Sequence, residues 1–407
     1  MPSLSDQLKS LGVKVGAKDL KPPQATNPHT IERILGGSVT STPMGETYLV
    51  ESRHSLDYAQ DASSLWTDQS LNVLAGWAQD SRINHIPLQA YSFLDTETTG
   101  LSGGTGTYAF LIGVGRFEAG EFHIAQFFMR DPVDEPGQLA ALEEFIASCS
   151  AIVTFNGKAF DMPLLNTRYL THGWRPPFSD FVHIDLLHLA RRFWRDRLPS
   201  RTLPNLEYQI LGTTRTEEDV PGWMIPQIFF DYLRSGDARP LKSIFYHNAM
   251  DVLSLAALLS HIANLLADPL NRKVEHGLDI IAMAKLFEDQ GFIDLAIQLY
   301  LQGLERAVPD ETALNTILRL AAIHKRRDNF AAAVALWEEA SKYQQLHAHV
   351  ELAKYYEHRA QDYHQAIFWT ETALAIVSET RFPKHEKYTW QADLTHRLAR
   401  LQRKQHG

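Results

Sequence analysis

Two carboxylates, Asp95 and Glu97, follow the apolar run 91–94 and precede the turn-forming residues Thr98-Thr99-Gly100. Side chains alternate across a strand, so residues two apart face the same side. If this segment is a strand, both carboxylates project from its end, where water and substrate have access. Like charges placed together repel unless a cation neutralises them, so a hard divalent ion bound by oxygens is the economical explanation. The alternative is a strand that runs into a turn with polar residues at its edge.

Two further acidic residues occur in later segments. Asp161 follows an apolar run, 151–155, and a glycine turn, and it begins a helix just before Met162-Pro163. Asp is a favoured N-cap, so one of its oxygens can cap the helix while the other binds a metal. Asp251 lies in an amphipathic helix predicted over 239–265, and His247 precedes it by four residues, which places both on one face. Taken alone, Asp251 is an ordinary solvated helix residue.

These acidic residues, in this order and in these contexts, resemble the DEDD (DnaQ-like) 3′–5′ exonucleases across about residues 88–265. Asn156, five residues before Asp161, also fits the second motif of that superfamily. The stretches 183–191, 203–212 and 219–222, and the run His247-Asn248-x-x-Asp251, are similar to its YprB-like branch. That branch joins a ribonuclease-H-like domain to tetratricopeptide-type repeats.

The resemblance implies a site and an activity. Two Mg²⁺ or Mn²⁺ ions, about 3.5–4 Å apart, would be held by Asp95, Glu97, Asp161 and Asp251. The terminal nucleotide would contact the main chain of Thr98, Thr99, Gly100 and Leu101 and the side chains of Asn156 and Phe160. The implied activity is phosphodiester hydrolysis, 3′ to 5′, from a single-stranded end. DNA and RNA both remain open as substrates, and ribonuclease-H-like folds also support endonucleolytic cleavage.

The last motif departs from the DEDD pattern, which has Tyr four residues or His five residues before the final Asp. Here His247 stands at minus four and Tyr246 at minus five. On a helix, minus four lies directly over Asp251, whereas minus five is rotated away by about 140°. Imidazole is a base at neutral pH and a phenol is not. We therefore expect His247 to orient or deprotonate the attacking water, with Tyr246 as the alternative.

Composition limits the classes of protein to which the chain can belong. The net charge of −9 is not that of a general nucleic-acid binder. Phe193 and Trp194, however, are interleaved with a local cluster of arginines that suits phosphates and unstacked bases, namely Arg191, Arg192 and Arg195. The alternative is a solvated basic helix face. Cys149 is the one cysteine, and no long apolar run is evident, so we expect a cytoplasmic protein that spans no membrane.

The 407 residues should form more than one domain. We predict a poorly ordered arm over 1–35, a small β/α element over 36–86, an α/β ribonuclease-H-like domain over 87–268 and helical repeats over 277–407. The α/β domain should contain a five-stranded mixed sheet flanked by helices. Ala296, Ala333 and Ala366 mark equivalent turns in the all-α region, near the tetratricopeptide period of about 34. A final helix would cap these repeats. The repeats are a possible protein-binding surface, and a scaffold with an inactive nuclease fold is the alternative function.

Overall fold

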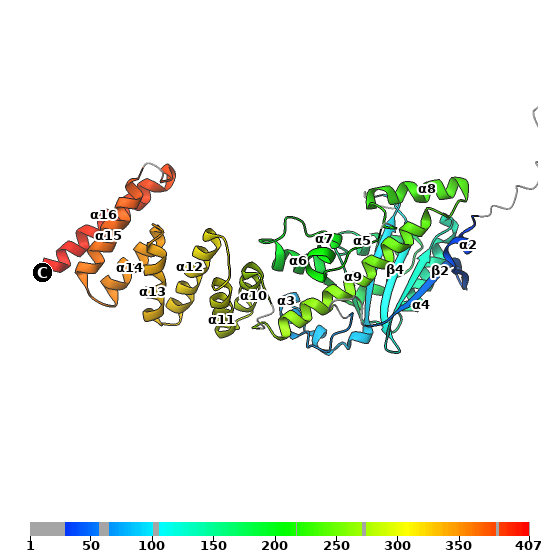
Figure 1. The fold of residues 1–407 in the computed structure, drawn as a ribbon, viewed down its shortest axis with the longest axis horizontal. Coiled ribbons are helices and arrows are strands. Elements are labelled where there is room, and N and C mark those ends of the chain that lie inside the picture. Colours follow the sequence, from blue (N-terminus) through cyan, green and yellow to red (C-terminus); the bar gives the residue numbers. More distant parts are fainter. Residues whose placement is uncertain are drawn as a thin grey trace, which may run out of the picture. The chain divides into compact units, whose positions relative to one another are not determined.

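The computed structural model describes residues 29–56, 65–100, 106–216, 218–270, 274–379 and 382–406 (Figure 1). Most of the predicted N-terminal arm and Leu101 lie outside these ranges. The chain divides into two compact units. The first comprises Met1–Arg191 and Ser200–Ala267, and the second comprises Arg192–Pro199 and Asp268–Gly407. The domain boundaries predicted from the sequence stay a prediction.

The first unit is built on one mixed sheet in which the strand order is β1-β2-β5-β4-β3-β6-β7. The pairs from β1 through to β3 are antiparallel, whereas β3, β6 and β7 run parallel. The strands are β1 (Ser38–Thr42), β2 (Gly45–His54), β3 (Tyr91–Thr98), β4 (Ala109–Glu118), β5 (Glu121–Phe128), β6 (Ala151–Thr154) and β7 (Val182–Asp185).

The prediction of five strands was wrong, because the sheet has seven. The β1–β2 hairpin joins it, and β2 pairs with β5 from Tyr48 opposite Phe128 to His54 opposite Phe122. Without this hairpin, β5 would be an edge strand with a row of unpaired backbone groups, which proteins generally cover. Tyr48 is buried where the hairpin meets the rest of the domain, and its hydroxyl accepts a hydrogen bond from the Gly37 N–H at 2.9 Å.

Helices cover both faces of the sheet and create two apolar cores. Residues of α4 (Glu135–Ile146) and α5 (Asp161–Thr171) pack with Leu94 and Ile112 of the sheet on one face. Residues of α8 (Ile225–Ser235) and α9 (Leu241–Ala267) pack with other strand residues on the opposite face, where the rings of Phe110 and Phe229 stack at 4.0 Å. The N-terminus of α5 and the middle of α9 therefore approach the sheet from opposite sides.

Helix α9 is long and apolar enough to cross a membrane by length and composition alone. Within the domain, however, 67% of the most apolar stretch of this helix is buried. Leu255, Leu258 and Ile262 are almost completely buried. This burial is that of a central core helix.

Shorter elements connect these layers. They are α2 (Ile31–Leu35), α3 (Asn72–Ala78), η2 (Ser81–His85), η3 (Leu88–Ala90), η4 (Pro132–Asp134), η5 (Pro177–Asp180), α6 (Leu186–Trp194), α7 (Leu203–Leu206), η6 (Glu207–Leu211) and η7 (Gly222–Met224). The segment η6 is a π-helical turn. Such turns are rare in proteins, and those that occur often lie at functional sites.

The described part of the second unit beyond residue 273 is helical. Its helices are α10 (Gly277–Asp289), α11 (Ile293–Leu304), α12 (Asp310–Arg326), α13 (Phe330–Ser341), α14 (Leu346–His358), α15 (Tyr363–Ser378) and α16 (Lys384–His406). Each helix packs against the next one in the chain, so α10 pairs with α11, α12 with α13 and α14 with α15. Ala296, Ala333 and Ala366 are fully buried, as expected for equivalent packing positions in repeated helix pairs.

Candidate active site

The four predicted carboxylates come from three elements. Asp95 and Glu97 are on β3, Asp161 is the first residue of α5, and Asp251 is on α9. Burial raises the pKa of Asp95 well above its usual value, and the charges of Asp251, Glu97 and Asp161 raise it further. Burial likewise raises the pKa of Glu97, as do the charges of Asp251 and Asp161. The structure thus brings the four carboxylates close enough for their charges to repel.

Asp161 has its own hydrogen-bond partner. Its carboxylate accepts a hydrogen bond from the Thr96 hydroxyl at 2.5 Å, and Thr96 lies between Asp95 and Glu97 on β3. Burial raises the pKa of Asp161 to about 6, although the bond from Thr96 opposes this change. The start of α5 is therefore attached directly to the strand that carries the other two carboxylates.

We expect the protein in a chelator to lose stability as the pH rises from about 4 to about 6. The folded pKa of Asp161, about 6, exceeds its ordinary value of 3.8, so the native state binds more protons than the unfolded state in this window. Such a shift corresponds to about 3 kcal/mol of unfolding free energy at neutral pH. Urea unfolding between pH 4.5 and 7.5 measures it. Asp161→Asn, which cannot ionise, should lose less, and an equal loss in both proteins would contradict the assignment.

Asn248 connects Asp95 to the neighbouring strands. Its side-chain amide is buried and donates to Asp95 Oδ2 at 2.9 Å, while its Oδ1 accepts from Gln126 Nε2 at 2.9 Å. Gly113 is the β4 partner of Asp95, and a Cβ atom there would lie 2.1 Å from Asn248 Oδ1. Glycine at 113 therefore allows Asn248 to approach the sheet and orient Asp95.

His247 and Tyr246 have different surroundings. The His247 ring lies between two carboxylates, with Nδ1 at 2.7 Å from Asp219 Oδ1 and Nε2 at 3.5 Å from Asp251 Oδ2. The Tyr246 hydroxyl instead accepts a hydrogen bond from the Thr216 N–H at 3.0 Å. The structure thus places His247, and not the Tyr246 hydroxyl, in contact with Asp251.

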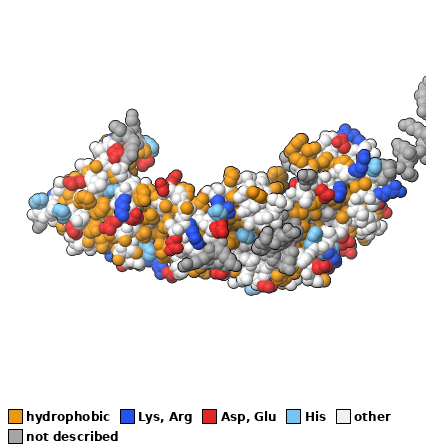
Figure 2. Space-filling model, in the orientation of Figure 1, with side chains coloured by type: hydrophobic (Ala, Val, Ile, Leu, Met, Phe, Trp, Pro, Cys, Tyr) orange, Lys and Arg blue, Asp and Glu red, His pale blue; other side chains and the backbone are white. Residues whose placement is uncertain are grey.

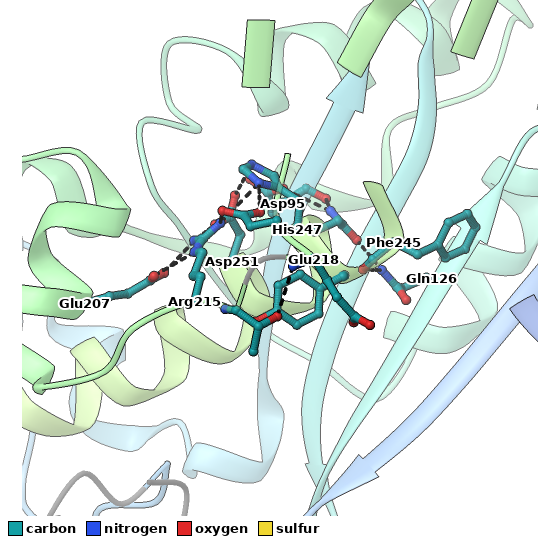
Figure 3. A network of polar contacts seen from close by, with 12 residues as sticks. Asp95, Gln126, Glu207, Arg215, Glu218, Phe245, His247 and Asp251 are labelled. Atoms are coloured by element: carbon teal, nitrogen blue, oxygen red, sulfur yellow. Dashed lines mark hydrogen bonds and ion pairs between the residues drawn. The ribbon is translucent and has the colours of Figure 1, made fainter. Parts of the chain in front are cut away.

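Arg215 is a site residue that the sequence analysis missed. Its guanidinium forms two hydrogen bonds with the buried carboxylate of Glu207, at 2.5 and 2.7 Å, and also pairs with Asp251 (Figure 3). Its side chain is only 7% exposed, so these charges interact with little screening by water. Burial raises the pKa of Asp251, and the Arg215 charge opposes this change. No motif marked Arg215, because Asp251, the predicted metal ligand with which it pairs, lies 36 positions away in the sequence.

A cavity of about 500 Å³ opens beside Asp95 and Asp161. Four of the residues predicted to contact a nucleotide line it, namely Thr98, Gly100, Asn156 and Phe160. The Phe160 ring is half exposed, as a stacking platform requires. Thr99 instead hydrogen-bonds the main chain of Tyr108 through both its N–H and its hydroxyl. The predicted contact of Leu101 lies outside the described residues.

The loop that carries Asn156 is supported by Asp185, a second residue whose role the sequence analysis missed. Asp185 is buried at the end of β7 and accepts hydrogen bonds from the N–H groups of Asn156, Lys158 and Leu187, at 2.8, 3.1 and 3.1 Å. Asn156 has a φ of +67°, a left-handed conformation that Asn tolerates better than most residues. Asp185 therefore holds Asn156 at the cavity, and its signal in the sequence was the stretch 183–191.

The structure distinguishes the three predicted arginines. Arg191 lines a second cavity, of about 480 Å³, together with Phe155, Asn156 and Arg201. Arg192 forms an ion pair with Asp289, whereas Arg195 is largely exposed beside Asp196. Of the three, Arg191 is the one that shares a cavity with a predicted nucleotide contact.

The donor set fits a divalent cation. Carboxylate oxygens of Glu97 and Asp251 and a ring nitrogen of His247 lie within 4.8 Å of one another. Asp95, which is partly buried, and Asp161, which is buried, add two carboxylates whose pKa values are raised, chiefly by burial. Oxygen-rich sites of this kind suit Mg²⁺ and Mn²⁺.

Comparison with known proteins relates the chain to a family, to a protein of similar sequence and to a solved structure. Residues 92–263 match the model of the RNase_H superfamily. "Uncharacterized protein YprB" of Bacillus subtilis (strain 168) is 33% identical over 344 residues, which are 82% of this chain and 80% of that protein. Among solved structures, the family B DNA polymerase of the archaeon Pyrobaculum calidifontis superposes with a TM-score of 0.34 and 16% sequence identity. The superposition covers 59% of this chain and 29% of the polymerase, and the similarity is low. The chain belongs to the YprB family and contains a domain of the ribonuclease H superfamily.

Proposed function

We propose that the protein is a metal-dependent nuclease that hydrolyses single-stranded DNA or RNA from its 3′ end. The observation that carries this proposal is the group of four buried or partly buried, mutually repelling carboxylates, two of which line a cavity of about 500 Å³. The ions would be held by Asp95, Glu97, Asp161 and Asp251. Bound Mg²⁺ or Mn²⁺ would supply charge stabilisation to the attacking and leaving oxygens.

The chain's own residues would bind and orient the end of the strand. Phe160 offers an exposed ring on which the last base can stack, and Asn156 lies on the same cavity wall. The volume of the cavity is that of a site for one small ligand such as a nucleotide.

Arg191 would bind a phosphate of the incoming strand, because it lines the cavity next to Asn156. The face drawn in Figure 2 has acidic and basic side chains interspersed among hydrophobic ones, in keeping with the net charge of −9. Attraction of nucleic acid would therefore depend on individual arginines near the site and not on a broad basic surface.

We expect Arg191→Ala to weaken binding of single-stranded oligonucleotides and to lower the slope of log K against log [salt] by about 0.7, the value for one phosphate contact. Fluorescence anisotropy in Ca²⁺, from 50 to 300 mM salt, measures the slope. Arg192→Ala is the matched control, because the Arg192 side chain is committed to Asp289. A slope that changes in Arg192→Ala and not in Arg191→Ala would contradict this assignment.

We further propose that α10–α15 are three tetratricopeptide-type helix pairs, capped by α16, that bind a protein partner. The full burial of Ala296, Ala333 and Ala366 at equivalent positions supports the repeats. Cys149 is the single cysteine, so the chain forms no internal disulfide, which supports a cytoplasmic protein. The burial of α9 supports a protein that spans no membrane.

The activity is tested with purified protein, Mg²⁺ or Mn²⁺, and labelled single-stranded DNA and RNA. A 3′-end label should be released as a mononucleotide, whereas a covalently closed circular strand should remain intact. Cleavage of the circle would establish an endonuclease instead. No cleavage of either nucleic acid would leave the scaffold function as the better explanation.

A further inference from the structure

The structure assigns a second role to His247, which rests on the proposed function. We infer that its Nε2 atom is a metal ligand and forms, with Glu97 and Asp251, a mixed carboxylate–imidazole site. Such a site prefers a transition-metal dication such as Mn²⁺ over Mg²⁺, because imidazole nitrogen binds transition metals well and Mg²⁺ takes oxygen ligands. His247 would then act by binding the ion and not as the base that removes a proton from water.

The first step is the position of the ring proton. Nδ1 of His247 lies 2.7 Å from Asp219 Oδ1 and 3.2 Å from Arg215 Nη1. The Asp219 carboxylate can only accept a hydrogen bond, and the Arg215 guanidinium can only donate one. Nδ1 is either protonated, and then bonds to Asp219, or unprotonated, and then bonds to Arg215. The contact with Asp219 is shorter, and Arg215 Nη1 also has Asp219 Oδ2 at 3.5 Å. Nδ1 therefore carries a proton and donates a hydrogen bond to Asp219, which in the neutral ring leaves the lone pair on Nε2.

The second step is the direction of that lone pair. Nε2 lies 3.5 Å from Asp251 Oδ2, a separation that is long for a hydrogen bond. Two ligand atoms that each lie about 2.1 Å from one ion are roughly 3.0–3.4 Å apart in octahedral or tetrahedral geometry. A cation between the two atoms accounts for a nitrogen lone pair that faces a carboxylate oxygen. A hydrogen-bonded carboxylate behind a ligating histidine is the common arrangement in metal sites, and Asp219 provides it here.

The third ligand is Glu97, which is 9% exposed. Among the residues that the structure describes, none forms a hydrogen bond or an ion pair with its carboxylate. A buried carboxylate that accepts no hydrogen bond is costly, and an oxygen of Glu97 lies within 4.8 Å of both the His247 nitrogen and an Asp251 oxygen. Glu97 is thus directed at the same point as the other two ligand atoms.

Arg215 leaves this site open. It pairs with Oδ1 of Asp251, so that Oδ2, on the side of His247, remains for the ion. Glu207, with its own hydrogen bonds to Arg215, balances the arginine charge, and the net charge of the three ligands stays negative. Arg215 would therefore fix the orientation of Asp251 without replacing the cation.

The test is Mn²⁺ binding to the full chain, followed by electron paramagnetic resonance. The parent should show ¹⁴N coupling to bound Mn²⁺, and His247→Ala should lose it and raise the Mn²⁺ dissociation constant about 10–100-fold. Asp219→Asn, which no longer selects the ring tautomer, should weaken Mn²⁺ binding about 10-fold. His85→Ala, at an exposed histidine, is the control and should match the parent.

Absence of ¹⁴N coupling in the parent, which requires no variant to fold, would overturn the assignment. So would an Mn²⁺ affinity that is equal in the parent and in a folded His247→Ala protein. Coupling in a parent that cleaves neither DNA nor RNA would remove the proposed nuclease activity and leave the ligand assignment in place. Cleavage without coupling would do the reverse.

Discussion

Asp95→Asn is expected to reduce metal-dependent cleavage by about 10³-fold or more, because it removes the carboxylate that interacts with all three others. Asparagine has almost the same shape and can still accept the hydrogen bond from Asn248. In a chelator, the melting temperature should be unchanged or higher than that of the parent, since one of several repelling charges is gone. Steady-state cleavage and thermal unfolding measure the two effects.

A matched control for this variant is Asp231→Asn. Asp231 is an exposed carboxylate on α8 that pairs with Arg234. Neutralising it should leave the activity unchanged and should change the free energy of unfolding by no more than about 0.5 kcal/mol. Full activity in Asp95→Asn would falsify the assignment of Asp95 to the metal site. A large loss of stability in that variant would mean that Asp95 is mainly structural.

His247→Ala should reduce the rate about 10²–10⁴-fold, whether the imidazole acts as a base or binds an ion. Tyr246→Phe should reduce it only a few-fold, because the ring remains and the lost hydroxyl accepts a hydrogen bond from Thr216 alone among the contacts described. Both variants are compared with the parent in Mg²⁺ and in Mn²⁺, with circular dichroism to verify folding. The ion-ligand role predicts the larger loss for His247→Ala in Mn²⁺.

The opposite ranking of the two variants by rate would reassign their roles. If Tyr246→Phe were inactive and His247→Ala nearly normal, Tyr246 would be the residue that acts on the attacking water. His247 would then be a residue that only attaches the loop of Asp219 to α9. A melting temperature that falls equally in both variants without loss of rate would support the same structural role.

The periodicity of strands and helices alone determined which predicted site residues lie on the same side of their strand or helix. Asp95 and Glu97 share one side of β3 because side chains alternate along a strand, and His247 and Asp251 share one side of α9 because they are one helical turn apart. The same rule separated Tyr246 from Asp251. These relations involve residues at most four positions apart, so they could be derived before any tertiary contact was known.

Tertiary structure decided what surrounds these residues. Arg215 pairs with Asp251 across 36 positions, and Asn248 orients Asp95 across 153, in the space that Gly113 leaves beside β4. The β1–β2 hairpin joined the sheet because β5 had a free edge, which no pattern within the hairpin indicates. A sequence pattern describes a residue's own element and not the element packed against it. The acidic residues could therefore be predicted from the sequence, whereas the partners that set their charge and orientation appeared only in the folded chain.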